Sequence, residues 1–499
     1  MNRESRKKKL KYNTITSLIL QLVTIICGFV LPRLFLQYYG SEVNGLISSI
    51  SQFLGVIALM QMGVGAVVQS AWYKPLARKN EKEISNIFVS AQRFFRLIGK
   101  IFLIYLFLLC IIFPRIIDSN FSSFFSISLI LIISVSLLAE YFFGITYQLL
   151  LTADQKSYIP NIIRIVSLII NTIVCSILII KGSSIQIIKL TTSIIFLLRP
   201  FILERYVSKH YNIDKNATFV EEPIKQKWNG IAQHIASFIL GNTDVMILTI
   251  FSSLSVVSVY SVYNLVVSGI RQFVLASTSG MQSLFGNMLA NKEFELLEKE
   301  FSRFEWLIHT LVMLLFSCTA LLIVPFISVY TKGITDTNYI QPVFGILISL
   351  STGMYCLRLP YNIIVLAAGH YKQTQASAII EASINLIVSI ILVFNYGLIG
   401  VAIGTLAAMT YRTIYLAHYI SNIIHYSFSS FIKHVFVDVL SMVTIFIIVN
   451  NQNLLVTNFG SWIILAIKVL SENLVIIGII NFVFYKDSCT LFLKKIFGK

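Results

Sequence analysis

The sequence predicts an all-α polytopic membrane protein with about 14 transmembrane helices, arranged as two pseudo-symmetric six-helix lobes plus a C-terminal helix pair. Only 12% of the 499 residues are charged and 56% are hydrophobic, with a mean hydropathy of +0.80. A soluble domain averages about 25% charged residues. Long apolar runs recur along the whole chain, and short segments of the first half recur in the second.

Each apolar run of about 20 residues is long enough to cross a bilayer as a helix. The first six runs lie near 12–36, 44–68, 96–114, 123–149, 159–180 and 184–204. The next six lie near 228–251, 254–280, 303–330, 342–367, 375–395 and 398–420. A final pair lies near 432–449 and 461–485.

The distribution of lysine and arginine predicts the orientation. Basic segments, among them 74–82, 205–227 and 486–499, alternate with loops that are poor in cations. Cytoplasmic loops of membrane proteins are enriched in Lys and Arg, so we expect both termini in the cytoplasm. The same rule accounts for the net charge of +17 without a nucleic-acid partner.

Three matched segments indicate an internal repeat. Positions 170–174 (INTIV) match 384–388 (INLIV), 151–153 match 366–368, and 76–77 match 289–290, with nearly the same offset in all three places. With six helices each, the two halves enter the membrane in the same sense. We therefore expect an N-lobe at 1–204, a cytoplasmic linker at 205–227, a C-lobe at 228–420, and helices thirteen and fourteen with a basic cytoplasmic tail at 421–499.

Enzyme signatures are absent from the sequence. It contains no Walker A loop, no HExxH and no nucleophile elbow. The six cysteines have no metal-type spacing, and the seven histidines are scattered. We expect no catalytic residues, no metal site and no cofactor. The short external loops also leave no room for the outer domain of a membrane glycosyltransferase or polymerase.

Four arginines within apolar runs are the candidate binding residues. Arg271 and Arg358 lie nearest the middle of their runs, Arg412 somewhat inward, and Arg33 toward the outer end of helix one. An arginine at mid-membrane costs roughly 2.5–3.5 kcal/mol on insertion scales. Each could snorkel or pair with a carboxylate, and the acids at comparable depth are Glu140, Asp244 and Glu381. The alternative, which we favour, is a cationic cavity that binds an anionic substrate.

Polar side chains on one helix face extend this candidate site. Asn264, Ser268 and Arg271 are spaced at i, i+4 and i+7, which places them on one face of a helix. Gln52 precedes Asn264 by close to the repeat offset. We expect Gln52, Asn264 and Ser268 to line the cavity; hydrogen bonding between helices is the other interpretation.

Arg33 and Asp244 are also separated by nearly the repeat offset. Equivalent positions in a two-lobed transporter can face each other across the central axis. Our hypothesis is that these two side chains form an ion pair that closes an outer gate.

Several local sequences resemble a known family. They are LQYYGS at 36–41, MGVG at 62–65, YKPLA at 73–77, NTD at 242–244 and VYSVY at 259–263. With fourteen helices, they resemble the polysaccharide-biosynthesis (O-antigen and capsule repeat-unit) flippases of the multidrug/oligosaccharidyl-lipid/polysaccharide exporter superfamily. That superfamily also contains lipid II flippases and multidrug and toxic-compound extrusion antiporters.

The resemblance implies alternating-access transport of an undecaprenyl-diphosphate-linked oligosaccharide from the inner to the outer leaflet of the bacterial cytoplasmic membrane. It implies a cationic central cavity to which Arg33 and Arg271 contribute, and a lipid-tail groove near the last helix pair. Expected partners are membrane lipids, a polysaccharide polymerase and glycosyltransferases, with the protein acting as a monomer. Lipid II flipping and cation-coupled drug antiport are the alternatives, and Arg33 in a helix without an acid argues against the antiporter.

Overall fold

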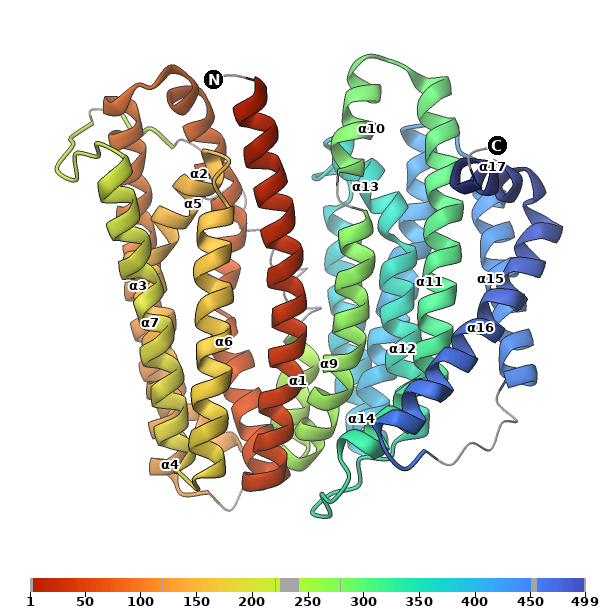
Figure 1. Cartoon of the computed structure of the whole chain (residues 1–499), viewed down its shortest axis with the longest axis horizontal. Helices are drawn as coiled ribbons and strands as arrows, with labels where there is room; N and C mark the ends of the chain where they lie inside the picture. Colours follow the sequence, from red (N-terminus) through yellow and green to blue (C-terminus); the bar gives the residue numbers. More distant parts are fainter. Residues whose placement is uncertain are drawn as a thin grey trace. The chain divides into compact units, whose positions relative to one another are not determined.

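The computed structural model (Figure 1) describes residues 3–117, 121–219, 221–224, 242–278, 280–449 and 456–497. Within these ranges every regular element is a helix, which confirms the predicted all-α class. The chain forms two compact units, Met1–Ser258 (unit 1) and Val259–Lys499 (unit 2). The boundary between them lies inside α9 (Leu254–Ser277). The expected lobe boundaries at 204 and 228 stay predictions.

Unit 1 is a bundle of long helices. In it α1 (Arg3–Gly55) packs along α6 (Tyr158–Ile180), and α4 (Ser123–Ala139) packs along α7 (Ile185–His210). The other helices are α2 (Ala58–Arg78), α3 (Glu81–Ile116), the π-helix η1 (Glu140–Gly144), α5 (Ile145–Ala153) and a short apolar helix at Asn242–Phe251. Large aromatic side chains fill the core, among them the fully buried Trp72, Phe88, Phe95, Phe102 and Phe113.

Unit 2 places the C-terminal helix pair against the rest of its bundle. The long α11 (Phe294–Tyr330) packs against α12 (Pro342–Leu357), α15 (Phe428–Val449) and α16 (Phe459–Phe484). The remaining elements are α10 (Met281–Ala290), α13 (Leu359–Ala367), α14 (Gln375–Tyr419), the 3₁₀ turn η2 (Ile420–Asn422) and α17 (Lys486–Phe497). One apolar cluster, including Met313, Ile445 and Val469, joins α11 to α15 and α16.

Single glycines break the two longest helices. A straight helix with the 53 residues of α1 would be about 80 Å long at ~1.5 Å per residue, well over twice the thickness of a hydrocarbon core. Gly40 (φ 81°, ψ 175°) interrupts α1, and Gly397 (φ 50°, ψ −121°) interrupts α14. Only glycine readily adopts these combinations of φ and ψ, so each break needs this residue. Each of the two long helices, α1 and α14, therefore contains parts of two predicted membrane-spanning helices.

Eleven segments of the described residues are long and apolar enough to span a membrane. One of them, Gln375–Asn422, contains both predicted runs 375–395 and 398–420. The predicted run 228–251 lies mostly outside the described residues. The polytopic membrane fold is confirmed, whereas the count of 14 helices stays a prediction.

The helix ends repeat at the offset expected from the sequence. Helices α3 and α11 begin at 81 and 294, and helices α5 and α13 end at 153 and 367, so the two pairs are shifted by nearly the same amount. Both predicted helices 123–149 and 342–367 are interrupted, the first by η1 and the second at Arg358. A helix break inside each half is thus part of the repeated pattern.

Apolar side chains remain exposed along whole helix faces. On α6 they recur every three or four residues, at Ile162, Val166, Ile169, Ile173, Ile177 and Ile180, and each is at least 40% exposed. Exposing so large an apolar surface to water is energetically unfavourable, whereas contact with lipid tails is not. These faces are suited to a bilayer.

We predict that Gly397→Ala destabilises the protein by about 1–3 kcal/mol, because a Cβ there meets no atom within 4 Å and the cost is backbone strain alone. Thermal unfolding in detergent measures the loss. Gly478→Ala in α16 is the matched control, since its Cβ also meets nothing within 4 Å but its φ is not positive. Equal melting temperatures for the two variants would contradict the assignment of Gly397 as a required break.

Candidate functional site

Arg358 stands at the break between α12 and α13. It is the C-cap residue of α12 and the N-cap residue of α13. Pro360 follows within the first turn of α13. Proline has no N–H, so it cannot continue the hydrogen-bond ladder of α12. Arg358 Nη1 pairs with Oε1 of Glu381 on α14. The break therefore places a guanidinium beside a buried carboxylate.

Arg412 reaches the same carboxylate from the second half of α14. Its Nε lies 3.6 Å from Glu381 Oε2, and its Nη1 donates to the backbone oxygen of Thr374 at 3.0 Å and to the hydroxyl of Ser377. The Arg412 and Glu381 side chains are only 9% and 3% exposed. The turn at Gly397 brings these two parts of α14 together. Glu381 is thus shared between two guanidiniums.

Arg271, on α9, joins this group through an aromatic ring. Its guanidinium lies 5.5 Å from the ring centroid of Tyr355, and that of Arg358 lies 4.3 Å from the same centroid. Both distances are within the range of cation–π attraction. The buried Nε of Arg271 has no hydrogen-bond partner in the described part of the chain. The described part of the chain therefore leaves this donor unsatisfied.

The guanidinium cluster, defined as Arg271, Arg358, Arg412 and Glu381, has three positive charges and one negative charge. Glu381 can offset one of the three, which leaves an excess of two. Buried charges are costly unless they are paired. The cluster is consequently suited to a ligand with about two negative charges.

Asn264 and Ser268 lie on α9 with Arg271, and all three are half-buried. The Ser268 hydroxyl donates to Asn264 Oδ1 at 3.1 Å. The structure thus places the predicted polar residues on the helix that presents Arg271. Their role as a cavity lining stays a proposal.

The remaining predicted residues, Arg33, Gln52 and Asp244, belong to unit 1. Arg33 follows Pro32 in α1 and is half-buried, as is Gln52, while Asp244 is 6% exposed. The short helix that contains Asp244 is fixed to α1 by a 2.7 Å hydrogen bond between the hydroxyls of Ser49 and Thr249. The gate between Arg33 and Asp244 stays a hypothesis.

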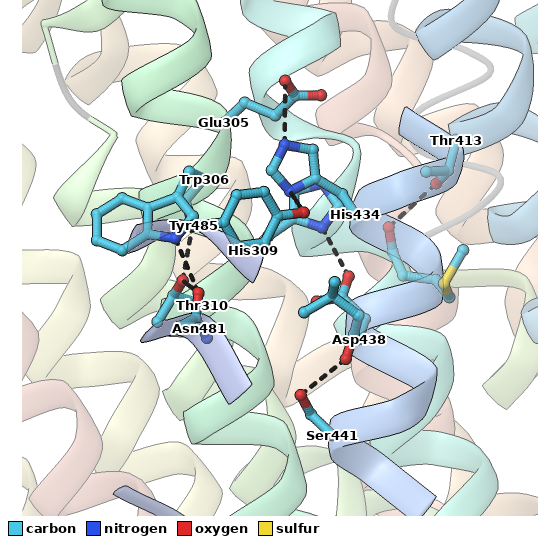
Figure 2. A network of polar contacts seen from close by, with 12 residues as sticks. Glu305, Trp306, His309, Thr310, Thr413, His434, Asp438, Ser441, Asn481 and Tyr485 are labelled. Atoms are coloured by element: carbon cyan, nitrogen blue, oxygen red, sulfur yellow. Dashed lines mark hydrogen bonds and ion pairs between the residues drawn. The ribbon is translucent and has the colours of Figure 1, made fainter. Parts of the chain in front are cut away.

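A second buried polar group was missed by the sequence analysis. Figure 2 shows Glu305 and His309 of α11 beside His434 and Asp438 of α15. These four residues are called the carboxylate–imidazole network. Each pair is spaced i, i+4 in an apolar helix, which places both members on one face. That spacing was visible in the sequence, but the pairing between two helices so far apart along the chain was not.

We predict that Glu381→Gln lowers the stability by about 3–5 kcal/mol, because it leaves two buried guanidiniums without their carboxylate. Thermal unfolding in detergent provides the measurement. The double variant Glu381→Gln with Arg412→Gln should lose less than the sum of the two single changes. Additive losses would show that Glu381 and Arg412 do not interact.

The fold is shared with known transporter structures. The lipid II flippase MurJ, in an inward closed conformation, superposes with a TM-score of 0.72 at 17% identity over 95% of this chain and 99% of that one. An inward-facing multidrug resistance MATE family transporter of the MOP superfamily gives 0.60 at 15% identity, over 80% and 95%. The eukaryotic MATE transporter AtDTX14 gives 0.56 at 14% identity, over 94% and 99%.

The sequence matches no protein-family model and no curated protein. At identities of 17% and below, the likeness concerns the fold. These three structures are transporters by title, and none is an enzyme. The chain shares its fold with these solved transporter structures.

Proposed function

We propose that this protein is a flippase that moves undecaprenyl-diphosphate-linked oligosaccharide repeat units from the inner to the outer leaflet of the bacterial cytoplasmic membrane, by alternating access. The product would serve capsule, O-antigen or exopolysaccharide synthesis. The observation that supports this most strongly is the guanidinium cluster, whose excess of two positive charges matches a diphosphate. The fold shared with a lipid II flippase supports the same substrate class.

Arg271 is the proposed diphosphate contact. Arg358 and Arg412 are both engaged with Glu381, whereas Arg271 Nε has no hydrogen-bond partner among the described residues. Guanidinium groups bind phosphate oxygens through paired N–H donors. Asn264 and Ser268 on the same helix can then hydrogen-bond to sugar hydroxyls.

Outward movement of the diphosphate is favoured by an inside-negative membrane potential. Each negative charge that crosses gains roughly 2.3 kcal/mol per 100 mV. The proposed location is the bacterial inner membrane with both termini in the cytoplasm, and the proposed partners are a polymerase and glycosyltransferases. We propose a monomer as the functional form.

Lipid II itself is the alternative substrate, because the MurJ structure has the same fold. The mass of the lipid that accumulates when the protein is lost distinguishes the two. A lipid-linked repeat unit supports the main proposal, and lipid II supports the alternative. An unchanged lipid pool with increased sensitivity to cationic drugs would instead indicate a multidrug antiporter.

We predict that Arg271→Ala abolishes transport while the protein still reaches the membrane, because the guanidinium proposed to contact the diphosphate is lost. Mass spectrometry of undecaprenyl-linked lipids in cells should show the same accumulation as deletion. Arg303→Ala is the control, since Arg303 pairs with Glu300 at 2.6 Å on a partly exposed face of α11. Normal lipid levels with Arg271→Ala would refute the cationic site.

The gate hypothesis makes a separate prediction. Arg33→Asp and Asp244→Arg should each impair transport by placing like charges together, and the double reversal should restore it. The same lipid analysis measures all three variants. If the double reversal restores nothing, the two side chains do not form the gate.

A further inference from the structure

The carboxylate–imidazole network is buried as deeply as the guanidinium cluster, and the proposed substrate site does not use it. Its side chains are 1% (Glu305), 3% (His309), 8% (His434) and 12% (Asp438) exposed. The hydroxyls of Tyr361, Tyr426 and Tyr485 complete its hydrogen bonds (Figure 2 shows Tyr485). In the described part of the chain no three His, Cys, Asp or Glu side chains are placed to hold a metal ion.

The hydrogen bonds assign the proton on one nitrogen of His309. Tyr361 donates its only hydroxyl proton to Glu305 Oε1 at 2.8 Å. The Tyr361 oxygen lies 3.0 Å from His309 Nε2, so it must accept a proton from that nitrogen. With Glu305 ionised, His309 Nε2 is therefore protonated.

A further proton lies on the other side of the ring. His309 Nδ1 is 2.6 Å from Asp438 Oδ2, and neither a bare ring nitrogen nor a carboxylate can donate. One proton must occupy this contact, either on the imidazole or on the carboxyl group. The His309–Asp438 pair thus holds one proton more than a neutral histidine beside an ionised aspartate.

The charge balance of the network also favours one bound proton. Two carboxylates with two neutral imidazoles would leave two negative charges buried together, which is unfavourable in a membrane interior. One bound proton reduces this to a single negative charge. The His434 and His309 rings are tilted toward each other with centroids 4.8 Å apart, and this proximity disfavours a charge on both rings.

In the described part of the chain, the titratable groups near His309 come from several neighbouring elements. His434 Nε2 lies 3.5 Å from Glu305 Oε2, and its Nδ1 lies 2.9 Å from the Tyr485 hydroxyl. Lys433 Nζ lies 4.7 Å from the Tyr485 ring centroid, at the edge of the network. Among the described residues, these groups are Glu305 from α11, Tyr361 from α13, Tyr426 before α15, Lys433, His434 and Asp438 from α15, and Tyr485 after α16.

A short helix links this network to the guanidinium cluster. Tyr361, which contacts both His309 and Glu305, lies in the first turn of α13. Arg358 caps the same turn and pairs with Glu381. Pro360 stands between them and keeps α13 separate from α12. A shift of α13 would therefore change both sites at once.

We propose that the carboxylate–imidazole network is a proton-binding site, with the proton held between His309 and Asp438, and that binding and release of this proton drive the transport cycle. Loss of the proton leaves two facing acceptors that repel, which loosens α15 from α11. The change reaches Arg358 through Tyr361 and α13. The part that concerns transport rests on the proposed flippase function; proton binding does not.

Nitrogen-15 histidine NMR of the whole protein in detergent, without substrate, tests proton binding. The signal that disappears in His309→Gln and remains in His425→Gln, an exposed position, belongs to His309. We expect its Nε2 to stay protonated throughout, and its Nδ1 side to titrate at a different pH in Asp438→Asn than in the wild type. A bare Nε2, or identical titration in both proteins, would overturn the site.

The lipid analysis in cells tests the coupling. Asp438→Asn and Tyr361→Phe should accumulate the lipid-linked oligosaccharide as deletion does, at wild-type protein levels in the membrane. If Asp438→Asn does not fold, Tyr361→Phe, which removes a single hydroxyl, decides the outcome. Normal lipid levels in these variants, when deletion does cause accumulation, would overturn coupling and leave the flippase standing. No accumulation after deletion would instead refute the flippase and leave the NMR result valid.

Discussion

The sharing of one carboxylate between two guanidiniums organises unit 2. Glu381 holds Arg358 at the end of α12 and Arg412 on the second half of α14. Without this carboxylate, three cations that are buried or half-buried would lie close to one another with no opposite charge beside them, which is costly. With it, the group keeps a positive excess that only an anion can neutralise. Stability and the proposed binding of a diphosphate thus depend on the same contact.

Interrupted helices make such contacts possible inside an apolar bundle. A regular helix satisfies its own backbone and offers a ligand only side chains, whereas a break can redirect a side chain and provide a place for movement. The break at Arg358 positions a charge, and that at Gly397 brings Glu381 and Arg412 together. The same short α13 contacts both buried polar groups, so a small displacement there affects both.

Much of the fold could be predicted from the sequence, because lipid imposes a simple rule on helix length and hydropathy. The apolar runs, the repeat offset and the isolated arginines were all visible. The site was only partly predictable. Glu381 was one acid among several, and its partners Arg358 and Arg412 meet it only because of the turns at Pro360 and Gly397. His309 and Asp438 were not predicted, because each histidine of the sequence was considered without its neighbours along the helix. His309 follows Glu305 by four positions, and Asp438 follows His434 by four.

The turn at Gly397 also bears on how the chain enters the membrane. Almost no chain separates the helical halves of α14. Two apolar segments joined so closely are not expected to insert into the membrane one after the other. After the first had crossed, no polar loop would follow it to stay in the water on the far side. They are expected to insert together as a helical hairpin. A finished hairpin of this kind also leaves almost no polypeptide beyond the lipid surface for a protease or an antibody to recognise.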